Sequence, residues 1–368
     1  MKTAKPHWKR NKQKAPFASF LSLVLLLPGI VAIAGCQKKE TPPQKDSFDI
    51  KEATTLADAK KRKKVLLVQS YHTGYPWVDA ITRGVRMALS DTDAELQVFY
   101  MDTKRKTTEA WKRQVGNEAQ NVMNDWKPDV VIAADDNAQQ YFAKDFVGKS
   151  HPQFVFCGVN ARPQKYGYPA SNVTGILERP HLNASLALLH KLKPEAKRIA
   201  IITDDSPTSA GALGFMTSLP KPFEIVSIKT PSTFVDWKQA VKQAQNDADA
   251  IAIYMYHTVK DHSDADSMEP RKVIFWTVNT SEIPIIAFFI FAVDDGALCG
   301  YLESGLEHGF KAGQMAKQIL EGKSAGDIPM ITALEGQSML NLITARKLGI
   351  NVPREIVKTT DVVIGKKK

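Results

Sequence analysis

The chain has 368 residues, of which 43% are hydrophobic and 24% charged, and its formal net charge is +10. This length exceeds what one hydrophobic core usually supports, so it predicts two lobes. The excess positive charge belongs to the first 64 residues, and from residue 65 onward basic and acidic side chains balance. That distribution argues against nucleic acid as a partner, because a nucleic-acid-binding face needs lysine and arginine clustered among the folded residues.

Residues 1–35 predict a lipoprotein signal peptide. Lysine and arginine residues precede an apolar run, 17–34, which leads into Ile33-Ala34-Gly35-Cys36. This tetrapeptide resembles the bacterial lipobox, which implies a diacylglyceryl group on Cys36 and cleavage before it. The alternative, an uncleaved transmembrane anchor, is disfavoured because the run barely reaches spanning length and Pro28-Gly29 interrupts it.

The signal predicts an exported protein, lipid-anchored to the cell envelope on the periplasmic side. Gln37 follows Cys36, and by resemblance to lipoprotein sorting in bacteria with two membranes this favours the outer membrane. Residues 36–62 predict a flexible tether, since they have few large apolar groups to offset the entropy of ordering. The remaining cysteines, Cys157 and Cys299, are compatible with a disulfide or with two buried thiols.

Apolar runs alternate with amphipathic segments from residue 65 onward. This pattern predicts an α/β lobe in which helices cover both faces of a parallel sheet. The apolar runs are 65–70, 95–101, 129–134 and 153–160, and the helical segments between them are 77–89, 107–126 and 137–146.

A second series of the same kind follows the irregular stretch 161–171 and predicts a second lobe. Its helical segment 233–246 has Ser232 or Thr233 as an N-cap ahead of a periodic apolar face. The apolar runs of this series are 198–205, 223–230, 249–256 and 283–290.

Candidate ligand-binding residues follow the predicted strands, because ligands of such sheets bind at the carboxyl ends of the strands. The aromatic residues between 71 and 77 match neither a helical nor a strand period, which favours a binding loop. Alternatives remain: Ser70 is also a candidate N-cap, and Trp77 also suits packing against the sheet. The candidates are Ser70, Tyr71, His72, Tyr75, Trp77, Asp135, Asp136, Asn137, Gly158, Asn160, Asp205, Tyr256, His257 and Asp294.

Asp135 and Asp136 suggest the chemistry of the ligand. A carboxylate that loses water in a closing cleft needs a cation or several hydroxyl donors. We therefore hypothesise that one of the pair contacts an ammonium or a polyol, while Tyr71, Tyr75 and Trp77 cover the apolar face of the ligand. The alternative is that Asp136 or Asn137 only caps the following helix.

Five segments resemble the ABC transporter substrate-binding family that includes tryptophan- and tyrosine-binding members. They are residues 69–85, "FCGVNA", "NVTGILERP", "YHTVKD" and "GFKAGQMAKQILEGKSAGDIP". The resemblance implies a type I periplasmic binding protein fold, in which two Rossmann-like lobes are joined by three crossovers. It also implies that 309–322 is a helix returning to the first lobe. The expected lobes are 63–172 with 294–328 and 173–293 with 329–368.

The function implied is that of an extracytoplasmic solute-binding lipoprotein that delivers a small molecule to an ABC permease. The ligand class is an amino acid or another amine- or hydroxyl-bearing solute. Similar domains serve histidine kinases, so a receptor that signals to a membrane kinase is the alternative. The chain has no G-x-S-x-G, H-E-x-x-H or C-x-x-C motif, which argues against an enzyme, and we expect no cofactor or metal. The polar segment 257–267 is predicted to be a solvated loop.

Overall fold

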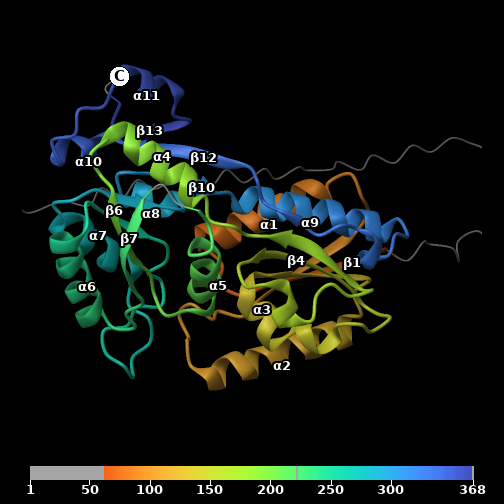
Figure 1. Ribbon diagram of the computed structural model, residues 1–368. Helices are drawn as coiled ribbons and strands as arrows, with labels where there is room; N and C mark the ends of the chain where they lie inside the picture. The colour runs from red at the N-terminus through yellow and green to blue at the C-terminus, as the bar shows by residue number, and fades with distance from the viewer. Residues whose placement is uncertain (1–61, 221–222, 367–368) are drawn as a thin grey trace, which may run out of the picture. The chain divides into compact units, whose positions relative to one another are not determined.

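The computed structural model describes residues 62–220 and 223–366, which lie within one compact unit (Figure 1). The predicted signal peptide, almost all of the predicted tether and the predicted lipidation site, Cys36, lie outside the described residues. None of the described helices is both long and apolar enough to cross a membrane.

The first lobe is built on a parallel sheet in the order β11-β5-β4-β3-β1-β2. Residues 65–68 of β1 are completely buried, which explains their unbroken apolar run: helices cover both faces of the sheet. The helices α1 (Pro76–Ala88) and α9 (Gly305–Leu320) cover one face, and α2 (Glu109–Trp126) and α3 (Asp135–Tyr141) cover the other (Figure 1). The strands are β1 (Lys64–Gln69), β2 (Glu95–Tyr100), β3 (Val130–Ala134), β4 (Gln153–Val159), β5 (Val173–Leu177) and β11 (Ile331–Thr332).

The second lobe is built on a sheet in the order β13-β12-β10-β9-β8-β6-β7, in which only the β10–β12 pair among the described strands is antiparallel. Alternate residues of β6 pack on opposite faces of the sheet. The strands are β6 (Arg198–Ile202), β7 (Glu224–Lys229), β8 (Ala250–Ile253), β9 (Ile285–Ala287), β10 (Cys299–Glu303), β12 (Gly336–Asn341) and β13 (Val362–Ile364). The helices are α4 (Leu182–Leu192), α5 (Pro207–Met216), α6 (Phe234–Asp247), α7 (Pro270–Thr280), α8 (Ile290–Asp294), α10 (Leu342–Lys347) and α11 (Arg354–Thr359).

The predicted α/β architecture of two lobes is confirmed. The helix expected at 233–246 is α6, and the Thr233 side chain caps it by accepting the backbone N–H of Asp236 at 3.2 Å. Cys157 and Cys299 are buried free thiols in different sheets, which excludes the disulfide alternative.

The lobe boundaries differ from those expected from the sequence. Strand β5 (173–177) pairs with β4 in the first sheet, and β10 (299–303) pairs with β9 and β12 in the second. Strand β11 (331–332) returns to pair with β5. The chain therefore crosses between lobes after β5, after β10 and after β11. Hydrogen-bonding partners decide which sheet a short strand joins, and the apolar pattern of one strand carries no information about its partner.

The packing of α1 against α9 requires glycine. A Cβ atom on Gly84 would lie 2.4 Å from the carbonyl oxygen of Leu306, and one on Gly309 would lie 2.0 Å from that of Ile81. A non-bonded Cβ contact shorter than 3.0 Å essentially never occurs, so a side chain at either position would push the two helices apart. The segment predicted to return to the first lobe is therefore held directly on its first helix.

Candidate functional site

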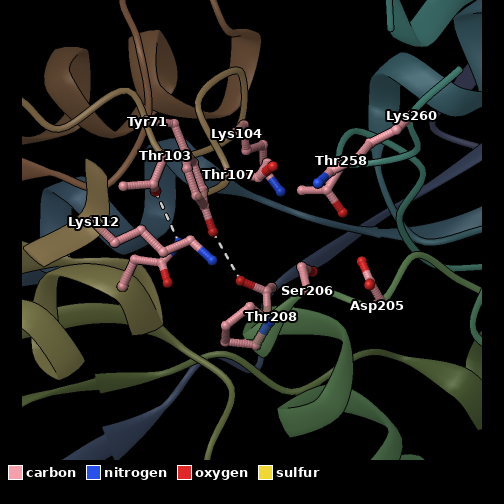
Figure 2. Close-up of a pocket in the computed structure, with 12 residues that line it drawn as sticks. Tyr71, Thr103, Lys104, Thr107, Lys112, Asp205, Ser206, Thr208, Thr258 and Lys260 are labelled. Atoms are coloured by element: carbon pink, nitrogen blue, oxygen red, sulfur yellow. Dashed lines mark hydrogen bonds between the residues drawn. The ribbon is translucent and has the colours of Figure 1, made fainter. Parts of the chain in front are cut away.

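A cavity of about 120 Å³ lies between the two lobes (Figure 2), and its lining residues come from segments that follow β1, β2, β3, β6 and β8. The lining residues of the first lobe come from the segment after β1, the loop after β2, and helices α2 and α3. The lining residues of the second lobe come from the start of α5 and the segment after β8. Its lining residues are Tyr71, Thr103, Lys104, Thr107, Lys112, Asn137, Asp205, Ser206, Pro207, Thr208, Thr258 and Lys260.

Direct hydrogen bonds hold the lobes together around this cavity. The hydroxyls of Tyr71 and Thr208 point toward each other and lie 2.8 Å apart (Figure 2). On the other side, the Ser267 hydroxyl donates to the Lys104 carbonyl oxygen at 2.5 Å. The Tyr254 hydroxyl, which follows β8, lies 3.0 Å from Asn160 Oδ1 in the first lobe. The structure therefore shows a closed arrangement.

Lys104 is the unusual member of the cavity lining. It is 2% exposed, and its Nζ has no hydrogen-bonding partner among the described residues. Nζ lies 4.3 Å from the ring centroid of Tyr71 and 5.8 Å from that of Tyr75. Burial lowers the pKa of Lys104, whereas the negative charge of Asp204 opposes that shift. A buried, unpaired ammonium is costly, so its presence here points to a missing partner.

Asp204 supplies a negative charge behind the cavity without contacting Lys104 through a hydrogen bond. Its Oδ1 accepts from the hydroxyls of Ser206 and Ser209, each at 2.6 Å, and its Oδ2 accepts the Thr258 N–H at 3.0 Å. Although burial opposes ionisation, Lys104 and these donors hold the pKa of Asp204 below its ordinary value. Asp204 is therefore an ionised group whose oxygens are already occupied.

Asp135 is buried beneath the cavity and does not line it. It begins α3 with a left-handed backbone, φ 66°, and its Oδ1 accepts the indole N–H of Trp77 at 2.8 Å. Oδ2 has no partner among the described residues. Burial raises the pKa of Asp135 to about 8, so the carboxyl is protonated at neutral pH. The left-handed Gly158 makes room for it, since a Cβ there would lie 2.8 Å from Oδ1.

Asp136 is a structural residue. Its Oδ1 accepts the Ala161 N–H at 3.1 Å and the Tyr166 hydroxyl at 2.8 Å, and its Oδ2 accepts the Asn160 N–H at 3.1 Å. These bonds hold the loop after β4 and leave little capacity for a ligand. Ser70 is structural as well: its hydroxyl donates to the Ala134 carbonyl and accepts the Ala138 N–H, which ties β1 to the first turn of α3.

Asn137, one of the residues predicted from the sequence, lines the cavity. Its amide Nδ2 donates to the Thr103 hydroxyl at 2.8 Å, and its Oδ1 has no partner in the described chain. Asp205 lies at the rim of the cavity and is exposed. Its carboxyl is nevertheless partly desolvated, and this partial burial, followed by the nearby charge of Asp204, raises the pKa of Asp205.

A wider pocket of about 680 Å³ adjoins the cavity, and Lys104 lines both. The Tyr75 ring lies 4.9 Å from the His257 ring and 5.7 Å from that of Phe291. Burial lowers the pKa of His257, so its imidazole is neutral at neutral pH. The predicted residues that line this pocket are His72, Tyr75, His257 and Asp294.

The other predicted residues pack behind the residues that line the cavity and the wider pocket. Tyr256 stacks on His257 at 4.6 Å, and the Gly158 N–H donates to His308 Nδ1 at 3.2 Å. Trp77 packs edge-on against Phe289, which agrees with the packing alternative. The prediction that 257–267 is a solvated loop is right for residues 261–264, which are exposed, and wrong for residues 257–259, which are buried. Residues 62–220 and 223–366 contain no cluster of side chains suited to a metal ion.

The candidate residues chosen from the sequence include three of the twelve that line the cavity, Tyr71, Asn137 and Asp205. Lys104 directly follows the strand-end pair Asp102-Thr103, and Thr208 follows Asp205-Ser206, so proximity to a strand end was the available signal. The missed residues are Thr103, Lys104, Thr107, Lys112, Ser206, Pro207, Thr208, Thr258 and Lys260.

A family model described as "ABC transporter substrate binding protein" matches residues 72–364. The chain belongs to this family. The substrate-binding protein described here is 26% identical over 344 residues to the Tyrosine-binding protein of Clostridioides difficile (strain R20291), a match that covers 89% of this chain and 91% of that protein.

Solved structures show the same fold. The ABC domain in complex with L-Trp from Streptococcus pneumonia has a TM-score of 0.66 at 18% identity, and the match covers 82% of this chain and 100% of that one. The ligand-free, open structure of a substrate binding protein with adhesive properties from Clostridium difficile has a TM-score of 0.59 at 19% identity, covering 83% of this chain and 100% of that one. These matches confirm the type I periplasmic binding protein fold expected from the sequence.

Proposed function

We propose that this substrate-binding protein is an exported lipoprotein that captures a small solute between its lobes and delivers it to an ABC permease. The observation that carries the proposal is the set of buried polar atoms at the cavity without a partner in the described chain. They include Lys104 Nζ, Thr107 Oγ1, Asn137 Oδ1 and Thr258 Oγ1. Buried polar groups are almost always hydrogen-bonded, so a polar ligand that fills the cavity accounts for all four.

Closure of the lobes is the signal that a permease would read. The Tyr71–Thr208 and Ser267–Lys104 bonds exist only when the lobes are together. A ligand that contacts both lobes binds the closed form more tightly than the open form and shifts the population toward it. The Cys36 anchor and the tether would keep the closed protein close to a membrane, where a permease can engage it.

A ligand screen tests the binding step. Native mass spectrometry of the full-length protein in detergent should reveal a copurified small molecule. A thermal-shift screen should start with amino acids, because one relative is a tyrosine-binding protein and one similar structure holds L-Trp. A ligand at a hundred times its dissociation constant adds roughly 2.7 kcal/mol of stability. No copurified molecule and no stabilising ligand in a broad screen would contradict the proposal.

Small-angle scattering tests the closing step. We expect the radius of gyration to fall when ligand is added, because the cleft closes around it. A tight ligand that leaves the scattering profile unchanged would contradict capture by closure. Reconstituted uptake with the permease encoded beside this protein, if one is present, tests delivery; uptake that does not depend on this protein would refute it.

A further inference from the structure

The charges that line the cavity favour an anionic ligand. Lys104, Lys112 and Lys260 line it, whereas Asp205 is the one carboxylate in the described lining. Lys104 and Lys112 enter from the first lobe, and Lys260 enters from the second (Figure 2). Of these charged groups, the most deeply buried is the ammonium of Lys104, and its Nζ has no partner among the described residues.

The first turn of α5 reinforces this preference. Ser206, Pro207 and Thr208 present the N-terminal end of a ten-residue helix to the cavity. The Ser206 hydroxyl already caps the Ser209 N–H, and Asp204 accepts from Ser206 and Ser209 at this helix end. The Thr208 N–H and the helix dipole remain to favour negative charge on the cavity side. The helix end and Lys104 come from different lobes, so an anion between them would bridge the cleft.

An ammonium group would find no free buried carboxylate here. The oxygens of Asp204 accept hydrogen bonds from two hydroxyls and two backbone N–H groups. Those of Asp136 are occupied by two backbone N–H groups and a phenol. Asp135 accepts from Trp77 and lies outside the cavity lining. The exposed Asp205 alone remains at the rim.

The cavity itself is small, although the wider pocket that shares Lys104 lies beside it. A cavity of about 150 Å³ holds the six carbons of benzene, so 120 Å³ holds about five non-hydrogen atoms. Asn137 Oδ1 accepts a hydrogen bond, and the Thr258 hydroxyl donates or accepts one, and neither has a partner in the described chain. Both could serve a hydroxyl or a second oxygen on a compact anion.

We propose that the ligand of this cavity is a compact carboxylate without an ammonium group, of the size of a hydroxy or oxo acid, bound through Lys104. This inference rests on the proposed solute-binding function and specifies the class of solute. The carboxylate pairs with Lys104 Nζ and faces the first turn of α5. The remaining oxygen of the ligand hydrogen-bonds Asn137 and Thr258.

L-lactate and L-alanine form the matched pair that tests the ammonium question, since they differ only in a hydroxyl against an ammonium. Calorimetric titration of the full-length protein in detergent should include both, together with glycolate, pyruvate, lactamide and L-tyrosine. We expect at least one of the three hydroxy or oxo acids to bind at least tenfold more tightly than L-alanine. Lactamide, which lacks the charge, should not bind measurably.

Lys104→Met tests the role of the ammonium. The variant should lose at least tenfold in affinity for the acid, while its unliganded Tm stays the same or rises, because a buried unpaired charge has been removed. A purely structural lysine would predict the opposite change in Tm. Lys242→Met, an exposed position on α6, should change neither quantity and is the matched control.

The outcomes separate the inference from the proposed function. Tight binding of L-alanine or L-tyrosine, retained by Lys104→Met, overturns the inference and leaves solute capture intact. An acid that binds Lys104→Met with wild-type affinity also overturns it. If no member of the panel binds and no copurified molecule is found, the cavity holds only water and both proposals fail. The comparison of L-lactate with L-alanine on the unmodified protein decides the question even if Lys104→Met fails to fold.

Discussion

Replacing Asp135 with asparagine should make the protein more stable at neutral and mildly alkaline pH. The carboxyl is 1% exposed, and burial raises its pKa from 3.8 to about 8. The folded protein therefore holds this proton over a pH range in which the unfolded chain has lost it. Asparagine has nearly the same shape, carries no proton to lose, and keeps an oxygen that can accept the Trp77 N–H.

The sign and size follow from proton linkage. For an acid whose pKa is raised in the folded state, stability is greatest below the unfolded pKa and falls as pH rises toward the folded pKa. Each unit of pKa shift corresponds to 1.36 kcal/mol, so between pH 4 and pH 7 the wild type loses up to about 4 kcal/mol relative to Asp135→Asn. Water penetration and relaxation reduce such values, and we expect on the order of 2 kcal/mol.

Urea unfolding at pH 5, 6.5 and 8 measures the effect. The difference in unfolding free energy between Asp135→Asn and the wild type should grow in favour of the variant as pH rises. Asp93→Asn, at an exposed position, controls for the loss of one surface carboxylate. Parallel pH profiles for Asp135→Asn and the wild type would refute the buried, protonated carboxyl.

The other predictions concern Gly158, the contact between the lobes and the predicted lipid anchor. Gly158→Ala should lower the unfolding free energy by about 1–3 kcal/mol, because φ 66° is strained for alanine and its Cβ would meet Asp135 Oδ1 at 2.8 Å; an unchanged urea midpoint would contradict this. Tyr71→Phe removes the hydroxyl contact with Thr208, worth about 1 kcal/mol, so ligand affinity measured by calorimetry should fall roughly fivefold, and an equal affinity would show that this contact does not support closure. Cys36→Ser should yield a folded protein without acyl chains, and acyl labelling with detergent partitioning that match the wild type would disprove the lipobox assignment.

The sequence predicts the structure best where a run of adjacent apolar residues requires burial. Residues 65–68 had to be a strand covered on both faces, and Tyr71 could be placed in the cleft because it follows that strand and fits no period. The same rule located Asn137 after β3. It could not distinguish Asp136, whose oxygens are taken up by a loop 24 residues away, from a ligand-binding residue.

Lys104 shows why the rest of the site could not be predicted. It lies in "TKRKTT", residues 103–108, which has the composition of a solvated loop. Only the approach of the second lobe buries one lysine of that run and leaves its neighbour Arg105 exposed, paired with Asp102 at 2.7 Å. When two segments that are distant in the chain bury a residue between them, neither segment shows a periodic apolar pattern that would predict the burial.

The close contact of α1 with α9 also determines how the polypeptide can be divided. Helix α9 lies more than 200 residues after α1 in the chain, and both belong to the same lobe. A fragment that ends before Gly305 lacks α9, so the face of α1 around Gly84 stays uncovered. During synthesis, the first lobe therefore cannot be completed until most of the second lobe has been made. A single cut between the lobes therefore cannot yield two independent folding units. A circular permutation that begins at α9 would place this helix before β1, but β12, α10, α11 and β13 of the second lobe would still separate the two.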